Sequence, residues 1–186
     1  MTSLSVDYSI AQKVIHWVMS LLLILDLFVA QKFDTALEDW DRFESRSDHA
    51  TLGTIVAVLF IYRLYLRFRY GAPPLPDAMP AWQQKAARWG HITLYLLIGV
   101  LVTSGIATAI NATSEITLFA SFVLTSGQSD GSLFQTLRPI HEFATNAIIV
   151  LIAAHFLAAL YHQFFEKDQV LKKMLIFWRR IPHQED

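Results

Sequence analysis

Four of the seven histidines lie within long apolar stretches of the chain: His16, His49, His141 and His155. An imidazole is costly to place in lipid without a partner, so ionisable side chains inside a membrane usually serve a function. His141 and His155 are 14 residues apart in one apolar stretch. That spacing is about 21 Å along a helix and keeps both within roughly 40° of one face. Because no single ion can contact both, the spacing predicts two sites at two depths.

The composition indicates a membrane protein. Of 186 residues, 54% are hydrophobic and only 17% are charged, whereas soluble domains carry about 25% charged residues. The mean hydropathy is +0.37. The chain has no cysteine, which excludes disulfides, iron–sulfur clusters, zinc–thiolate sites and the C-x-x-C-H haem attachment motif.

Four apolar segments predict membrane-spanning helices at approximately 14–31, 49–69, 90–110 and 140–165. The first segment could instead be a cleaved signal peptide, but it is too long for such an apolar region and it contains Asp26. The expected fold class is all-α, an integral membrane four-helix bundle with its sites in the bundle core. Residues 1–186 would form a single membrane domain with a short cytoplasmic C-terminal tail.

The distribution of Lys and Arg orients this bundle. The N-terminal tail, the second connection and the C-terminal tail together hold 11 of these residues, against four in the first and third connections. The positive-inside rule therefore predicts that both termini and the second connection are cytoplasmic. This topology places His16 and His155 on the cytoplasmic side and His49 and His141 on the outer side, which predicts two pairs at matching depths.

Two imidazoles leave a single metal ion under-coordinated, since structural zinc takes four protein ligands and catalytic zinc usually three. A macrocycle that supplies four nitrogens in a plane completes six-coordination, and without a covalent attachment motif this indicates haem b. The prediction is thus two non-covalent haem b groups, with His16/His155 and His49/His141 binding the haem iron. One alternative is that the histidines are hydrogen-bonded packing residues. Another is a haem-free proton or metal transporter that uses His and Asp26.

The chain resembles the bacterial cytochrome b-561 family over nearly its whole length. The matching motifs are Y-S-x-x-Q-K-x-x-H-W (8–17), the histidine that opens the second helix, G-H-x-x-L-Y-L-L (90–97), H-E (141–142), H-x-x-x-A-L-x-H (155–162) and K-D-x-x-L-x-x-M (167–174). The resemblance implies a four-helix bundle in the bacterial inner membrane that holds two b haems and carries electrons. The four histidines named above match the ligand positions of the family.

The resemblance leaves several functions open. The preferred one is a redox carrier between the quinone pool, with ubiquinone as a possible substrate, and a donor or acceptor such as a periplasmic redox protein. A superoxide:ubiquinone oxidoreductase and a cytochrome b subunit of a larger dehydrogenase or hydrogenase are the alternatives. The lipid bilayer is an expected partner and nucleic acid is not. The first connection holds six acidic against three basic residues between positions 32 and 48, net −3. Such a rim would repel superoxide.

Other polar residues carry weaker signals. Arg63 and Arg67 could neutralise haem propionates, because Arg binds carboxylates bidentately, or could only set topology and contact lipid headgroups. His91 and His162 could hydrogen-bond a quinone or a propionate, or be interfacial residues wetted by water. Arg138 is the outer cation nearest in sequence to His141.

Asp26 and three glycines complete the set of candidates. Asp26 should lie near the bilayer centre, about 15 Å past His16, as a neutral acid hydrogen-bonded to Ser104 or Thr103, or else as a proton relay. The glycines at positions 53, 99 and 105 could allow close approach of helices or porphyrin.

Overall fold

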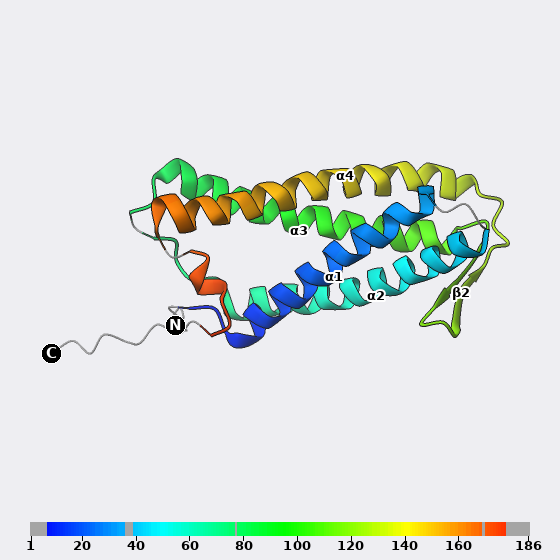
Figure 1. Ribbon diagram of the computed structural model, residues 1–186, viewed down its shortest axis with the longest axis horizontal. Helices are drawn as coiled ribbons and strands as arrows, with labels where there is room; N and C mark the ends of the chain where they lie inside the picture. Colours follow the sequence, from blue (N-terminus) through cyan, green and yellow to red (C-terminus); the bar gives the residue numbers. More distant parts are fainter. Residues whose placement is uncertain (1–6, 36–38, 77, 169, 178–186) are drawn as a thin grey trace.

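Four long helices account for most of the computed structural model, which describes residues 7–35, 39–76, 78–168 and 170–177 (Figure 1). The elements in chain order are α1 (Ile10–Thr35), α2 (Asp39–Tyr70), α3 (Ala81–Ile110), β1 (Glu115–Leu118), β2 (Phe122–Ser126), α4 (Ser132–Tyr161), a π-helical turn η1 (His162–Glu166) and a 3₁₀ turn η2 (Lys172–Met174). Within the described residues, four helices are long and apolar enough to cross a membrane. The predicted all-α membrane bundle is therefore confirmed.

Local sequence signals explain where the helices start. Ser9 and Gln12 form a capping box at α1: the Ser9 hydroxyl accepts the Gln12 N–H at 3.2 Å, and the Gln12 side chain accepts the Ser9 N–H at 3.0 Å. Before α4, the Asp130 carboxylate accepts hydrogen bonds from the backbone and hydroxyl of Ser132. These bonds lower the pKa of Asp130. α4 begins directly after Gly131, its N-cap residue, which has a φ of 79°.

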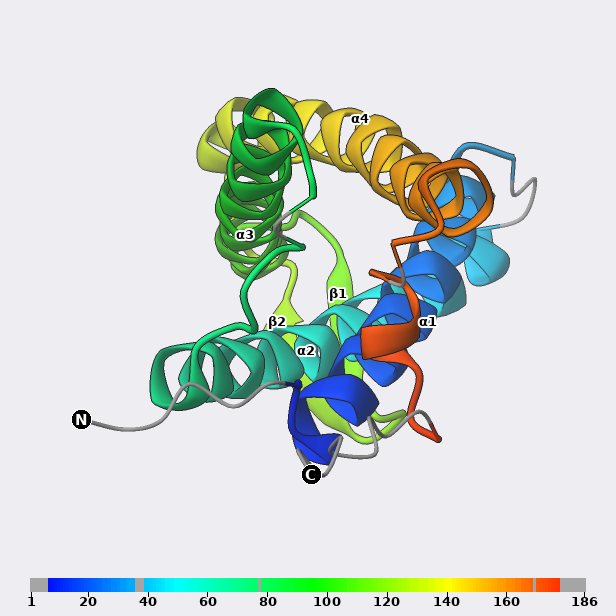
Figure 2. The same cartoon turned by 90° about the vertical axis from the view of Figure 1, so that its left-hand side faces the viewer.

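The helices stand side by side around the bundle axis (Figure 2). α1 packs along α2, α2 contacts α3, and α3 packs along α4. We call the end where α1 begins and α4 finishes the terminal end, and the opposite end, which carries the two strands, the hairpin end (Figure 1). Because neighbouring helices alternate in direction, residues near the start of α1 lie level with residues near the finish of α4.

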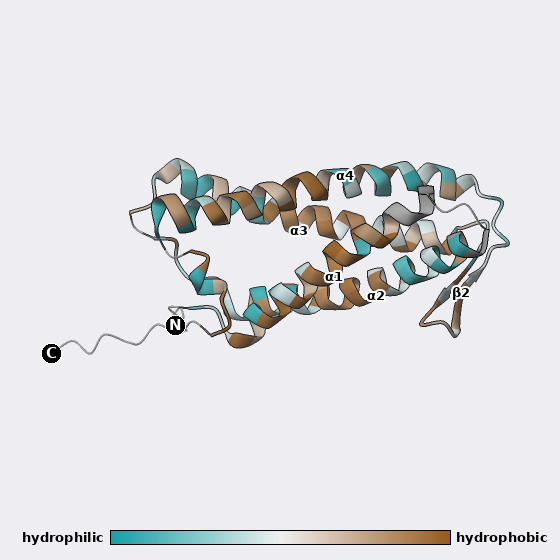
Figure 3. Cartoon of the chain, in the orientation of Figure 1, coloured by the Kyte–Doolittle hydropathy of each residue, from teal (hydrophilic) through white to brown (hydrophobic). Residues whose placement is uncertain are grey.

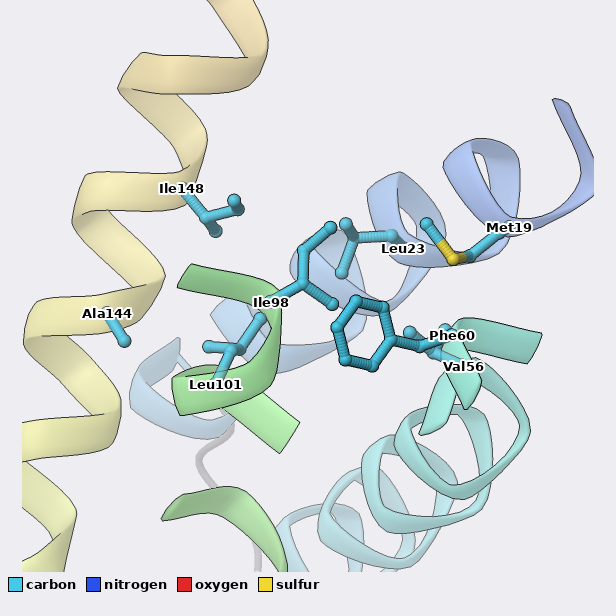
Figure 4. Close-up of a cluster of buried hydrophobic side chains, with 8 residues drawn as sticks. All are labelled: Met19, Leu23, Val56, Phe60, Ile98, Leu101, Ala144 and Ile148. Carbon is cyan, nitrogen blue, oxygen red and sulfur yellow. The ribbon is translucent and has the colours of Figure 1, made fainter. Parts of the chain in front are cut away.

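Apolar side chains from all four helices meet in one cluster between these ends (Figure 4). It consists of Met19, Leu23, Val56, Phe60, Ile98, Leu101, Ala144 and Ile148. On α4 the cluster falls between His141 and His155 in sequence. It therefore separates the two histidine levels with a layer that excludes water.

The outer surface of the helices is apolar too. Hydrophobic residues cover the middle of the bundle and hydrophilic ones gather nearer its ends (Figure 3). Large side chains that are mostly exposed occur on every long helix, including Phe28, Ile61, Leu96 and Val150. In water such a surface would be costly, whereas in a bilayer it contacts lipid chains.

The helices run beyond the predicted apolar segments. α2 begins at Asp39 instead of near 49, and α4 begins at Ser132 instead of near 140. α3 begins at Ala81 instead of near 90. Hydropathy marks only the part of a helix that meets lipid, and polar turns extend it into water. The strands β1 and β2 in the third connection were not predicted.

Candidate haem sites at two histidine pairs

His16 on α1 and His155 on α4 form a pair near the terminal end of the bundle. Their ring centres are 6.4 Å apart and the ring planes meet at 79°. We call them the terminal pair. Each side chain is only partly exposed, and no carboxylate of the described residues contacts either ring. These are the two histidines that the predicted topology assigned to the cytoplasmic depth.

His49 on α2 and His141 on α4 form the second pair, here called the hairpin pair. Their ring centres are 6.0 Å apart, with an angle of 66° between the planes. The structure thus brings together the same residues that helix depth predicts as partners. α4 contributes one histidine to each level, 14 residues apart, which corresponds to about 21 Å of helix.

The geometry of both pairs suits one metal ion between two imidazoles. Rings bound on opposite sides of a metal, with bonds of about 2 Å, would have their centres about 6.3 Å apart. The observed separations of 6.4 Å and 6.0 Å lie on either side of this value. No group of three or more His, Cys, Asp or Glu in the described parts of the chain could hold a bare metal ion. The donor set therefore fits a metal that brings its remaining ligands with it, as haem does.

Hydrogen bonds donated by Nδ1 orient both rings of the hairpin pair. The Nδ1 of His141 lies 3.0 Å from the Leu101 carbonyl and 3.1 Å from the Ser104 hydroxyl. A carbonyl can only accept, so Nδ1 carries the proton and Nε2 is left as the metal-binding nitrogen. The Nδ1 of His49 lies 2.7 Å from an Asp26 carboxylate oxygen. Both contacts are of the kind that holds a ligating histidine in one tautomer.

The contact between Asp26 and His49 overturns our expectation for this acid. We expected Asp26 to hydrogen-bond Ser104 or Thr103. Instead the Thr103 hydroxyl bonds carbonyls of its own helix, at Gly99 and Val100. Asp26 is buried at the level of the hairpin pair because α1 crosses α2 there. The sequence could not predict this contact. The position of Asp26 around α1 gives the direction of its side chain, but not the residue of α2 that this side chain contacts.

One of the three glycines makes room for a candidate ligand. A Cβ on Gly105 would lie 2.8 Å from Cε1 of His141, closer than side chains approach in folded proteins. At Gly53 and Gly99 the nearest atoms, on Asp26 and Phe60, would lie at 3.7 Å and 3.9 Å, which are ordinary contacts. Only Gly105 is therefore required by the packing of a histidine ring.

The two arginines have protein partners at the terminal end. The Arg63 guanidinium carbon lies 5.8 Å from the centre of the Tyr95 ring, in a cation–π arrangement. The Arg67 guanidinium lies near the hydroxyl of Tyr8. Burial raises the pKa of Tyr8, and the charge of Arg67 opposes that rise. A propionate contact for either arginine stays a prediction.

The two remaining candidate histidines occupy different settings. The His91 ring centre lies 5.4 Å from that of His155, so His91 borders the terminal pair. His162 lies in η1, where its Nδ1 is 2.6 Å from a carboxylate oxygen of Asp168. This contact ties the turn after α4 to the segment that follows, which gives His162 a structural partner inside the chain.

Comparison with known proteins finds relatives along nearly the whole chain. A family model described as Prokaryotic cytochrome b561 matches residues 7–176. Cytochrome b561 homolog 1 of Escherichia coli (strain K12) is 31% identical over 174 residues, covering 90% of this chain and 96% of that protein. Probable superoxide oxidase CybB of Yersinia pestis is 29% identical, covering 90% and 95%. Cytochrome b561 homolog 2 of Escherichia coli (strain K12) is 27% identical, covering 90% of each.

Proposed function

This chain belongs to the prokaryotic cytochrome b561 family, and from that premise we propose that it carries electrons across the bacterial inner membrane. The protein would exchange electrons with the quinone pool at one end and with a redox partner at the outer face at the other. The family makes the chain a multi-pass membrane cytochrome of the b type. The particular partners, the number of haems and the orientation are our proposal.

Two haem b groups would be held at the two histidine pairs. When bound, haem b supplies a reversible one-electron couple between ferric and ferrous iron. The observation that carries the proposal is the presence of two pairs, each with ring centres near 6 Å apart, at two levels of one bundle. His16 and His155 would hold one group, and His49 and His141 the other.

The protein around the pairs would orient the ligands and exclude water. Hydrogen bonds from Nδ1 of His49 and His141 leave Nε2 of each ring for iron. The apolar cluster of Figure 4 keeps solvent out between the two levels. Arg63 and Arg67 stand at the terminal end, where their charges could offset propionates.

The terminal end would face the cytoplasm. Lys13, Arg63 and Arg67 all lie at this end of the bundle, and basic residues favour the cytoplasmic side of a membrane. The outer partner would then meet the hairpin end. At that end Asp41, Glu44 and Asp48 of α2 are exposed, which favours a basic periplasmic protein over a small anion.

Haem content and reduction by quinol test this function. A pyridine haemochrome assay on purified protein should give two haem b per chain, and ubiquinol in nanodiscs should reduce both. One haem or none per chain would contradict the two-site proposal. Haems that quinol cannot reduce would remove the quinone pool as a partner.

Superoxide oxidation is the second candidate, because a relative at 29% identity bears the name Probable superoxide oxidase. In that case superoxide would reduce the hairpin-end haem and ubiquinone would accept the electrons. The exposed acidic residues of α2 disfavour this function, because they repel the superoxide anion. Adding superoxide as a competing donor in the quinol assay separates the two candidates, since only an oxidase would accept electrons from it rapidly.

A further inference from the structure

The third connection folds into a β-hairpin that is attached to α2. The backbone N–H of Thr117 donates to the Ser47 hydroxyl at 3.2 Å, and that of Phe119 donates to the Thr51 hydroxyl at 3.0 Å. Beside the base of the hairpin, Arg46 donates to the hydroxyl of Ser114 at 2.9 Å. From Arg46 to Thr51 these contacts follow α2 toward the middle of the bundle. The tip of the hairpin is therefore further into the membrane region than its base.

The depth of the tip follows from its contact with Thr51. Thr51 is two residues past His49, at the start of the apolar part of α2, because the charged residues Glu44, Arg46 and Asp48 come just before it in the span Phe43–Tyr70. The tip is consequently level with the hairpin pair instead of standing above the bundle. Figure 1 shows the hairpin projecting sideways past α2, with its tip away from the other helices.

The chemistry of the tip is apolar. Phe119, Phe122 and Val123 are 57%, 65% and 52% exposed. Residues 116–125, I-T-L-F-A-S-F-V-L-T, include no charged side chain. On the other side of β1, Ile116 and Leu118 are buried. The hairpin thus has one apolar side packed on the protein and a second apolar surface at its tip that no described residue covers.

The turn at the tip holds two residues in a strained conformation. Phe119 and Ala120 have φ angles of 52° and 55°, in the left-handed region that hairpin turns usually fill with Asn or Gly. A non-glycine residue there is strained, and such strain persists where surrounding contacts or function maintain it. Lipid contact with the Phe119 ring would offset the strain, whereas water would not.

The backbone of β1 permits shallow insertion. Unpaired N–H groups are excluded from lipid by their desolvation cost. The edge of β1 that faces α2 has its Thr117 and Phe119 N–H groups bonded to α2 hydroxyls, and its other edge pairs with β2. Val58, which is seven residues past Thr51 and so on nearly the same face of α2, is exposed, and so is Ile61.

From these contacts we propose that the hairpin tip, formed by Phe119, Phe122 and Val123, is immersed in the bilayer at the boundary between headgroups and acyl chains. The partner is lipid. The insertion anchors the third connection beside the hairpin pair and holds it there without a further helix. This inference does not depend on haem binding or on which side of the membrane the hairpin end faces.

Single-cysteine labelling tests the proposal, because the chain has no cysteine of its own. A nitroxide on Phe122→Cys, in full-length protein in phosphatidylcholine–phosphatidylglycerol vesicles, should collide several-fold more often with oxygen than with an aqueous nickel chelate. The same label on Gln128→Cys is the matched control, since Gln128 is exposed in the same connection after β2. It should show the opposite preference.

Equal access of the nickel chelate to both labels would overturn the proposal. So would a Phe122→Cys label shielded from oxygen and nickel alike, which would mean that protein covers the tip. Spin–spin broadening that vanishes on dilution with unlabelled chain would identify that cover as a second copy. Ala120→Cys supplies a second labelled position if Phe122→Cys fails to fold, and it should likewise favour oxygen.

Discussion

The Nδ1 atom of His49 lies 2.7 Å from Oδ1 of Asp26, and the Asp26 side chain is only 8% exposed. A carboxylate in this position holds a ligating imidazole in one orientation and makes it a more basic ligand. The hairpin pair therefore has a carboxyl partner that the terminal pair lacks among the described residues. The two sites should differ in redox potential for this reason.

Asp26→Asn should raise the midpoint potential of the haem at the hairpin pair. An amide accepts a weaker hydrogen bond than a carboxylate, so the ligand becomes less basic and ferric iron is less stabilised. Potentiometric titration monitored by haem absorbance measures the shift, with the haem at the terminal pair as internal reference.

Glu142→Gln is the matched control for Asp26→Asn. It removes a carboxylate next to His141 in sequence, but Glu142 is exposed and pairs with Arg138 at 2.6 Å. Exposed pairs have small effects, so neither potential should move appreciably. An equal shift in both haems for Asp26→Asn, or none with two haems present, would show that Asp26 does not act through His49.

Substitution of the histidines should separate two spectral components. His16→Ala and His155→Ala should both perturb one component, and His49→Ala and His141→Ala the other, because the two rings of each pair lie close enough to hold one metal ion between them. Low-temperature difference spectra of the four variants provide the measurement. The pairing is wrong if His16→Ala and His141→Ala remove the same component.

Gly105→Ala should lower haem occupancy at the hairpin pair. The added methyl group would meet the His141 ring at 2.8 Å, and the ring must turn away from its position to avoid it. Haem content and the hairpin-end spectral component report the loss. Gly99→Ala is the control, since its methyl group meets only Phe60 at 3.9 Å, and normal binding by Gly105→Ala would refute the steric argument.

Reduction of the oxidised haems by superoxide should be slow, and it should become faster as salt is added. Exposed carboxylates of α2 face the hairpin end, and salt screens the repulsion that they exert on an anion. Arg138, our candidate cation near His141, is already paired with Glu142. Stopped-flow absorbance at several ionic strengths gives the rate. A near-diffusion-limited rate that falls with salt would favour the superoxide oxidase function instead.

Much of the membrane architecture follows from the sequence alone. Apolar segments of sufficient length must form helices in lipid, because every backbone polar group has to be satisfied within the segment. The 14-residue spacing of His141 and His155 then sets two depths on one helix. With the helix directions taken from the Lys and Arg distribution, the depths of His16 and His49 follow without any knowledge of packing.

Contacts between helices could not be derived this way. Periodicity gives the direction of Asp26 on α1, but only the crossing of α1 and α2 brings it to His49. Gly105 is a second example. In the sequence it does not differ from Gly53 and Gly99, and only the packing of the His141 ring against it shows that a side chain would not fit there. The hairpin was missed because a short uncharged stretch without Asn or Gly at its turn has no turn signal, and contacts with Ser47 and Thr51 hold it in place. The sequence therefore determined which segments cross the membrane and at what depth the histidines lie, since both depend on hydropathy and helical rise. Only the tertiary structure decided what each histidine contacts, because side-chain partners depend on how the helices cross.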